Sequence, residues 1–262
     1  MEILFEHILP VYPELCIETS ELREQSEDSS DNMHTYLTKY RQLLDIIKNS
    51  PMLRLKTQPL FVWHDRNSAS WKFEEHRILH RLHFHLMKEA KKHFQKGEFD
   101  KAKSYLSNAV STCKDMLSSL EWIKTPYVVG MPELQQEYIL ALLFKTKGTQ
   151  YYNHHMNKTS TLASKMAYKY VELGNCLWKK SQDKEYENKL KAAHHHAVAS
   201  TSEDFKEILS HSTIAVSLSS DPKILEDHQT WLERNKSVHF ETPEDVTIPL
   251  FNIQKALHHI YA

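Results

Sequence analysis

Glycine is scarce in this sequence, and its scarcity constrains the fold more than any other feature. The 262 residues contain four glycines, at positions 97, 130, 148 and 174. Sandwiches and barrels need many tight turns, which favour glycine because a residue without a Cβ adopts positive φ freely. The same scarcity excludes the glycine-rich loops that cradle phosphates. We therefore expect a predominantly all-α fold.

Apolar residues recur at helical spacing along most of the chain. Near residue 40, one such stripe consists of Leu37, Tyr40, Leu43, Leu44 and Ile47. The stretch AKKHFQKGEFDKAKSYLSNAV, residues 90–110, has the alanine and aromatic spacing of a helical hairpin of the tetratricopeptide kind, with KGEFD at 96–100 as its turn, and it occurs in one good copy. Further amphipathic stretches follow as far as residue 234. The pattern predicts roughly eight helices, many of them joined by short connections.

The stretch PLFVWHDR, residues 59–66, interrupts this helical pattern. A proline precedes its apolar run and charged residues follow it, which predicts a short β-strand near 59–65. We expect a structural role for it, in which Phe61 and Trp63 pack against the helices. An aspartate in this position typically caps a turn, so a catalytic Asp65 is the less favoured alternative.

Two segments have no helical period. Residues 19–33, TSELREQSEDSSDNM, are polar and acidic and predict a flexible loop. Residues 235–249, NKSVHFETPEDVTIP, contain prolines and β-branched residues and predict an extended arm, and residues 235–262 as a whole are expected to form this C-terminal arm and a short helix. Because no shift in composition marks a linker, we expect a single domain over residues 1–262.

Charge and cysteine content narrow the choice of partners and compartment. Lys plus Arg number 33 and Asp plus Glu number 34, so nucleic acid is not an expected partner. Cys16, Cys113 and Cys176 are far apart and form no CxxC, which disfavours a disulfide scaffold or a cysteine zinc site. The sequence shows no apolar run of membrane-spanning length and no signal-peptide pattern. These features predict a cytoplasmic protein.

No pattern of side chains points to catalysis. His76 and His80 have the i, i+4 spacing of zinc-binding helices, but HRILH lacks the glutamate of HExxH. The alternative is that His76 is solvated and His80 lies at the edge of the packing. Cys113 lies on an apolar stripe and is most simply a core residue. We expect no enzyme, no metal site, no cofactor and no small-molecule substrate.

Two surfaces could bind partners. Tyr151, Tyr152, Leu162 and Met166 flank one helical hairpin and suit a groove for an amphipathic helix. Such a stripe can equally belong to the core. The second surface is basic and consists of Lys88, Lys91, Lys92 and Lys96, with further lysines at 101 and 103. It suits contact with an anionic membrane, although a run of this kind more often forms a solvated face.

The order of these pieces resembles that of the Bro domain family, the Alix-like adaptors of the ESCRT machinery. The resemblance covers about residues 35–250. Its pieces, in order, are KYRQLLDIIKNSP, the F-x-W-x-D of Phe61, Trp63 and Asp65, FEEHRILHRL, the alanine-rich hairpin, TPYVVGMP, and a late pattern of Asn235, Val238, Phe240 and Pro243. Departures include LFKTKG at 143–148, where the family has an Ala/Gln-rich segment. The chain is also shorter than the family's usual domain.

The resemblance implies a curved helical solenoid with a tetratricopeptide-like middle. It implies a non-enzymatic, endosome-associated adaptor in endosomal sorting, protein transport or membrane remodelling. Its concave face would bind the C-terminal amphipathic helix of an ESCRT-III subunit, and the family's apolar contact positions fall, within one residue, on Tyr151, Leu162 and Met166. An acidic position of the family falls near Lys96. The alternative is a diverged scaffold, such as a viral mimic of the fold, with another partner or self-association.

Overall fold

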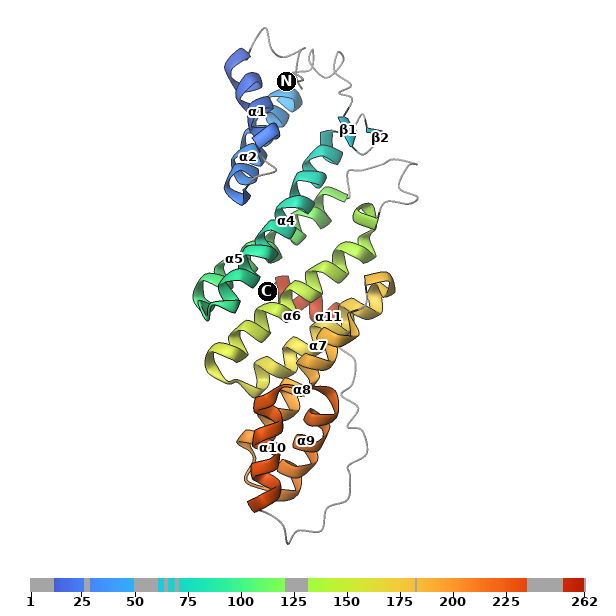
Figure 1. Ribbon diagram of the computed structural model, residues 1–262. Coiled ribbons are helices and arrows are strands. Elements are labelled where there is room, and N and C mark those ends of the chain that lie inside the picture. The colour runs from blue at the N-terminus through green and yellow to red at the C-terminus, as the bar shows by residue number, and fades with distance from the viewer. Residues whose placement is uncertain are drawn as a thin grey trace. The chain divides into compact units, whose positions relative to one another are not determined.

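The computed structural model describes residues 12–25, 29–49, 61–63, 66–68, 71–120, 132–181, 183–234 and 252–261. Helices dominate these residues, so the predicted all-α class is confirmed (Figure 1). The α-helices are α1 (Pro13–Gln25), α2 (Ser30–Asn49), α4 (Trp71–Gln95), α5 (Phe99–Leu120), α6 (Gln136–Lys158), α7 (Thr161–Leu177), α8 (Lys184–Thr201), α9 (Phe205–Leu218), α10 (Pro222–Arg234) and α11 (Ile253–Tyr261). Two 3₁₀ turns, η2 (Pro132–Leu134) and η3 (Lys179–Ser181), precede α6 and α8.

The chain divides into two compact units. Unit 1 comprises Met1–Lys91 and Asn108–Ile139, and unit 2 comprises Lys92–Ser107 and Leu140–Ala262. Helices α4, α5 and α6 each contribute residues to both units. The expectations of a single domain and of a curved solenoid stay predictions.

The predicted stripe on α2 belongs to the core of unit 1. Leu37, Tyr40, Leu43 and Leu44 are all at most 5% exposed. The rings of Tyr36 and Tyr40 pack edge to face, with centroids 5.9 Å apart. Residues spaced by three and four share one side of a helix, so this stripe is buried as the sequence pattern predicted. The side chain of Ile47 lies outside the described residues.

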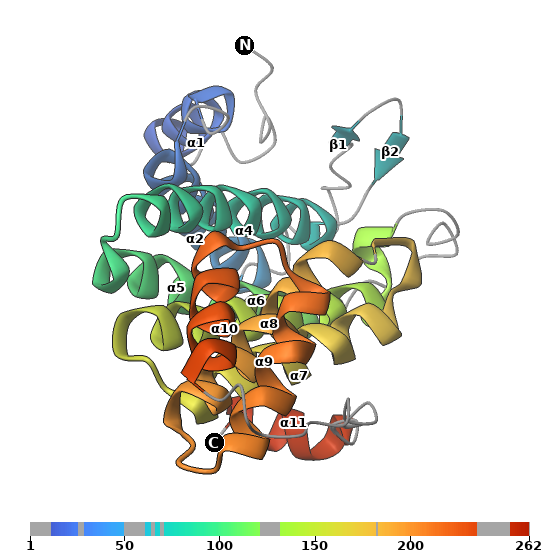
Figure 2. The ribbon, with the colours of Figure 1, turned by 60° about the horizontal axis from the view of Figure 1, so that its bottom comes forward.

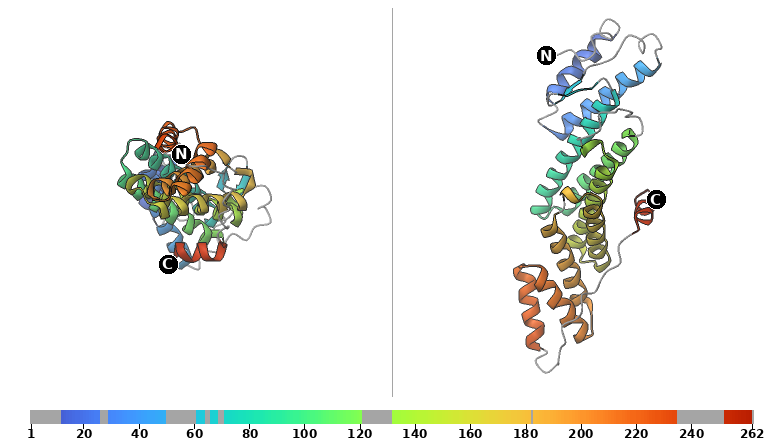
Figure 3. Two further views of the ribbon diagram at one scale, coloured as in Figure 1. Left: turned by 90° about the horizontal axis from the view of Figure 1, so that it is seen from below. Right: turned by 90° about the vertical axis from the view of Figure 1, so that its right-hand side faces the viewer.

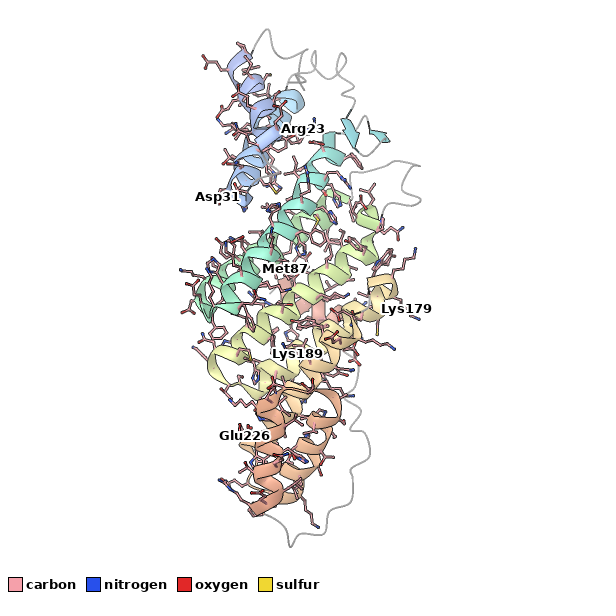
Figure 4. All side chains as sticks on the ribbon, viewed as in Figure 1. Arg23, Asp31, Met87, Lys179, Lys189 and Glu226 are labelled. Atoms are coloured by element: carbon pink, nitrogen blue, oxygen red, sulfur yellow. The ribbon has the colours of Figure 1, made fainter. Side chains whose placement is uncertain are left out.

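Unit 1 also buries charge. Glu74 of α4 is fully buried and accepts hydrogen bonds from Tyr36 Oη (2.8 Å) and Arg23 Nε (3.3 Å). The next residue, Glu75, accepts one from Arg41 Nε (2.7 Å), and Arg41 also pairs with Asp115. Figure 4 labels Arg23 on α1, among the side chains of α1 and α2. A buried carboxylate needs such partners because desolvation penalises its charge, so this network joins α1, α2, α4 and α5.

The prediction of a flexible loop over residues 19–33 is wrong. Helix α1 continues to Gln25 and α2 begins at Ser30, while 26–28 lie outside the described residues. Thr19 Oγ1 donates to Leu15 O (2.6 Å), and Ser20 Oγ donates to Cys16 O (2.9 Å). Bonds to the preceding turn satisfy these hydroxyls inside the helix. Small polar residues can therefore be buried there, which composition alone did not indicate.

A short hairpin falls where the sequence breaks its helical pattern. Strands β1 (Phe61–Trp63) and β2 (Arg66–Ser68) pair antiparallel, with Phe61 opposite Ser68 and Trp63 opposite Arg66. Asp65 and the side chains of Phe61 and Trp63 lie outside the described residues. Their structural role therefore stays a prediction.

In unit 2, α6 and α7 approach closely at two glycines. A Cβ on Gly148 of α6 would lie 2.8 Å from Ala167 O and 2.6 Å from Val171 Cγ2 of α7. A Cβ on Gly174 of α7 would lie 2.9 Å from Ala141 O of α6. Real Cβ atoms do not come this close, so glycine permits the approach of the two backbones. The pair forms a tight hairpin, and α8, α9 and α10 follow it side by side (Figure 2).

Candidate functional site

The α6–α7 turn presents the start of α7 to solvent. Thr159 has a φ of 47° and its N–H donates to His155 O (2.6 Å), which ends α6. Ser160 caps α7, because its side chain accepts a hydrogen bond from Ala163 N (3.2 Å). A serine in this position satisfies an N–H that has no partner within the helix.

Three residues of α7 form the candidate docking stripe: Leu162, Met166 and Tyr170. They recur every four residues and therefore share one side of the helix. Their exposure falls along it: Leu162 is 70% exposed, Met166 is half-buried and Tyr170 is fully buried. The stripe therefore has an exposed end at Leu162 and a buried end at Tyr170. Of the predicted contact residues, Leu162 and Met166 thus lie together on one face.

Tyr151 of α6 packs onto the buried end of this stripe. Its ring stacks on that of Tyr170, with centroids 5.6 Å apart and planes 12° apart. Lys147 Nζ lies 5.3 Å from the centroid of the Tyr151 ring. Burial raises the pKa of both tyrosines, so both hydroxyls stay protonated and can donate hydrogen bonds.

The hydroxyl of Tyr170 binds α11. Tyr170 Oη donates to the backbone oxygen of Ala256, 3.3 Å away. Ala256 and Ile260, four residues apart on α11, are 0% and 6% exposed, whereas Tyr261 is 55% exposed. Asn252 precedes this helix and caps it, because its side-chain oxygen accepts a hydrogen bond from Gln254 N (2.9 Å). An amphipathic helix of this chain therefore packs on Tyr170 of unit 2. In Figure 3 it is the red helix next to the C label.

Two lysines lie next to the docking stripe on α7. Lys165 and Lys169 lie three residues after Leu162 and Met166, on the same side of α7. Partial burial lowers the pKa of Lys169. The charges of Lys165 and of Lys255 on α11 lower it further, while Glu172 raises it. Lys169 therefore experiences positive charge from both α7 and α11.

Tyr152 is not a surface residue, so its prediction as a partner-binding residue is corrected. It is 7% exposed and packs in a core cluster with Ala167, Tyr168 and Val171. Its ring stacks on Phe94, with centroids 5.6 Å apart. Consecutive helical residues point about 100° apart, so Tyr151 and its neighbour Tyr152 cannot serve the same surface.

The four predicted membrane-facing lysines are exposed. Lys88 and Lys91 belong to unit 1, and Lys92 and Lys96 to unit 2. Gly97, with a φ of 73°, ends the segment in the left-handed conformation that favours glycine. Exposed lysines fit both membrane contact and an ordinary solvated face, so membrane contact stays a prediction.

Three histidines of α4 lie in the packing: His76 and His83 are buried and His80 is partly buried. His76 Nδ1 lies 2.7 Å from Ser119 Oγ, and its Nε2 bonds the backbone oxygen of Glu133. Burial lowers the pKa of His80 to about 3 and that of His83 to about 4. The prediction that His76 is solvated is wrong, since it is fully buried. Among the residues that the structure describes, no group of three or more His, Cys, Asp or Glu could hold a metal ion.

Sequence reasoning missed α11 as a part of this site. It predicted a short helix at the C-terminus but gave it no contact. The signal was present in IQKALHHIY, where Ile253, Ala256, Leu257 and Ile260 recur at three and four. Periodicity marks an apolar side but does not say which surface covers it.

Within the described part of the chain, no helix is long and apolar enough to cross a membrane. No protein-family model, no curated protein and no solved structure matches this chain.

Proposed function

We propose that this chain is a non-enzymatic adaptor that binds an amphipathic helix of a partner protein on the Leu162–Met166–Tyr170 stripe of α7. The observation that carries the proposal is the docked α11, which is itself an amphipathic helix bound at the buried end of this stripe. A neighbouring apolar surface, beginning at the 70% exposed Leu162, is left uncovered. The α7 surface therefore suits a helix, and part of it is open.

The identity of the partner in this proposal comes from the Bro domain resemblance. That resemblance points to the C-terminal helix of an ESCRT-III-type subunit, in endosomal sorting or membrane remodelling. The curved solenoid and a structural role for the strand near 59–65 belong to the same proposal. Of the contact positions that it assigned, Leu162 and Met166 share a face of α7, and Tyr151 stacks on Tyr170 of that face.

Apolar contacts should dominate the affinity. Burying a leucine or methionine side chain contributes about 1.5–3 kcal/mol, whereas an exposed ion pair contributes about 0–1 kcal/mol. Removing Leu162 or Met166 should therefore weaken binding more than removing Lys165.

One thiol–imidazole pair among the described residues is compatible with a non-enzymatic role. Cys113 Sγ lies 3.3 Å from His83 Nδ1, the arrangement of a thiol nucleophile and its base. However, these residues are 0% and 2% exposed. Burial also lowers the pKa of His83 to about 4, so the imidazolium form that would stabilise a thiolate is disfavoured. The pair contributes to the core of unit 1.

The test is calorimetric titration of the full chain with a synthetic ESCRT-III C-terminal helix. We expect binding, and we expect Leu162→Asp or Met166→Asp to weaken it at least tenfold, which corresponds to about 1.4 kcal/mol. Phe205→Asp is the matched control, because Phe205 is also an exposed apolar residue (52%) on another helix, α9. Its affinity should equal that of the wild type.

Two results would contradict the proposal. One is the absence of peptide binding by a folded chain, and the other is equal weakening by Leu162→Asp and Phe205→Asp. If the wild type instead forms oligomers that Leu162→Asp dissociates, the alternative scaffold with a self-associating surface replaces the adaptor. Sedimentation velocity of the two chains measures this directly.

A further inference from the structure

We propose that the α6–α7 turn, together with the neighbouring α4–α5 turn, docks on the surface of an anionic lipid membrane. This membrane surface consists of Met156, Lys158, Leu162 and Lys165 around the first turn and Lys96 in the second. Met156 and Leu162 enter the headgroup layer, and the lysines bind the headgroups. The inference goes beyond the proposed function and does not depend on it, although the two surfaces share Leu162.

The α6–α7 turn exposes apolar side chains at its tip. Met156, in the last turn of α6, is 45% exposed, and Leu162 follows in the first turn of α7. The two lie on either side of Thr159, where φ is 47°, and all of residues 156–159 are exposed. Exposed apolar side chains that lie together mark a surface that binds a protein or a membrane. A turn at the end of a hairpin presents them to a flat surface such as a membrane.

Two contacts place the α4–α5 turn beside the end of α6. Asn153 Nδ2 donates to Phe99 O (2.9 Å), and the ring of Tyr152 stacks on that of Phe94, with centroids 5.6 Å apart. Met156 follows Asn153 by three residues and Tyr152 by four, so it lies on the same side of α6, one turn closer to the tip. All these residues belong to unit 2, and the two turns lie side by side in Figures 1 and 2.

The α6–α7 hairpin carries lysines without carboxylates. Residues 138–171 contain five lysines and no aspartate or glutamate, although the two signs of charge balance over the whole chain. Lys158 and Lys165 are exposed, and Lys165 lies on the same side of α7 as Leu162, three residues earlier. Lysines beside exposed apolar side chains suit an anionic membrane, because the headgroups attract the charges while the apolar groups enter the boundary with the acyl chains.

The α4–α5 turn adds positive charge to the same surface. Lys96 is exposed and immediately precedes Gly97, which has a φ of 73°. Residues 92–107 contain four lysines and two acidic residues. One of the two, Glu98, forms ion pairs with His93 and Lys101. Lysines therefore outnumber carboxylates in both of the segments that form the two turns.

One further carboxylate lies near this end of α6. Burial raises the pKa of Tyr152, and the charge of Asp221 raises it further. Asp221 Oδ1 accepts a hydrogen bond from Lys223 N (3.0 Å) and so caps α10. Because a backbone N–H already binds this carboxylate, the lysines determine the sign of the charge at the tip.

Co-sedimentation with lipid vesicles tests the proposal. The full chain is mixed with vesicles of phosphatidylcholine alone, or with vesicles in which about one third of the lipid is phosphatidylserine. We expect binding to the anionic vesicles only. Added salt should weaken it, because salt screens the charges of the lysines. Amide exchange in the bound chain should slow at residues 156–162 and stay unchanged in α9 and α10.

Two pairs of variants locate the surface, and each compares exposed residues. Met156→Ser should weaken binding to anionic vesicles about tenfold, because its side chain no longer enters the membrane. Its control is Leu232→Ser on α10, where the leucine is 43% exposed. Lys158→Gln should weaken binding about fivefold, and its control is Lys206→Gln on α9. Both controls should bind as the wild type does.

Three results would overturn the membrane surface. They are the absence of binding to anionic vesicles by the folded wild type, equal binding to both kinds of vesicle, and equal weakening by Met156→Ser and Leu232→Ser.

The two proposals fail separately. Met156→Ser should leave binding of the ESCRT-III helix unchanged, and Met166→Ser should weaken binding of that helix but not of vesicles. If the wild type binds anionic vesicles but no ESCRT-III helix, the adaptor proposal alone is wrong. If it binds the helix but no vesicles, the membrane proposal alone is wrong.

Discussion

The two units join their helices by different means. In unit 1, charged groups connect the helices, because Glu74 and Glu75 of α4 pair with Arg23 and Arg41 of α1 and α2. In unit 2, backbones meet at Gly148 and Gly174, and aromatic rings stack around them. A charge network depends on every partner being present, whereas a close backbone contact depends on the absence of a side chain. Unit 1 should therefore be destabilised by substitutions that remove a charged side chain from its network. Unit 2 should be destabilised by substitutions that add a side chain at one of the two glycines.

This difference bears on the candidate site. The close approach of α6 and α7 at the two glycines places the stripe on α7 and Tyr151 of α6 in one hairpin. A surface built in advance loses less conformational entropy on binding a helix.

The largest expected effect is on the buried carboxylate of unit 1. Glu74→Ala leaves the buried hydroxyl of Tyr36 without this acceptor and Arg23 without this partner. Breaking a buried ion pair costs about 3–5 kcal/mol, and we expect a loss of this size in the free energy of unfolding from urea denaturation. The control is Glu18→Ala, which breaks an exposed pair with Lys39 and should cost less than about 1 kcal/mol. Equal losses would refute the distinction.

Acidification tests a feature that both units share, namely buried neutral histidines. Burial lowers the pKa of His83 in unit 1 to about 4 and that of His194 in unit 2 to about 3, from 6.5. Below pH 6.5 the unfolded chain binds protons that the folded chain does not. Stability should therefore fall with pH by about 1.4 kcal/mol per unit for each histidine, a total of about 2–3 kcal/mol each by about pH 4.5.

The slope identifies the residues responsible. His194→Gln and His83→Gln should each make the loss of stability between pH 6.5 and about 4.5 shallower by one histidine's share. Replacing the exposed His154 by Gln should leave the slope as it is. If His154→Gln flattens the curve as much as His194→Gln, burial is not the cause. Urea denaturation at each pH measures the free energy of unfolding.

A smaller effect is expected at the glycine contact of unit 2. Gly148→Ala places a methyl group 2.8 Å from Ala167 O, a clash that the backbone must relieve. Overpacking costs about 1–3 kcal/mol, and the better helix propensity of alanine returns up to about 1 kcal/mol. We expect a net loss of about 1–2 kcal/mol in urea denaturation. A more stable Gly148→Ala chain would show that the two helices are not held at this distance.

The smallest effect is at the cap of α7. Ser160→Ala removes the acceptor for Ala163 N and should cost about 1 kcal/mol. Fraying of the first turn would also loosen Leu162, the exposed end of the stripe. Amide exchange should therefore increase at residues 161–164 and remain unchanged around Tyr170. A uniform increase along α7 would mean that Ser160 stabilises the whole hairpin instead of its end.

Sequence periodicity predicted the elements of the fold but not the neighbours of each side chain. The stripe of α2 and the short C-terminal helix follow from apolar spacing, because burial on one side imposes the helical period on the sequence. The loop prediction for residues 19–33 failed because polar residues can be buried in a helix when their hydroxyls have partners there. Thr19 and Ser20 satisfy their hydroxyls within α1, so polar composition there does not indicate a loop.

For the candidate site, the sequence by itself determined that Leu162, Met166 and Tyr170 share one side of a helix, because four residues make slightly more than one turn. Helical geometry also implies that Tyr151 and Tyr152 point about 100° apart, although the sequence analysis assigned both to one surface. Only the tertiary structure decided that Tyr152 is core, that Leu162 is open and that α11 covers Tyr170. The physical reason is that the period of a helix depends on local geometry, whereas burial depends on which distant segment packs against it.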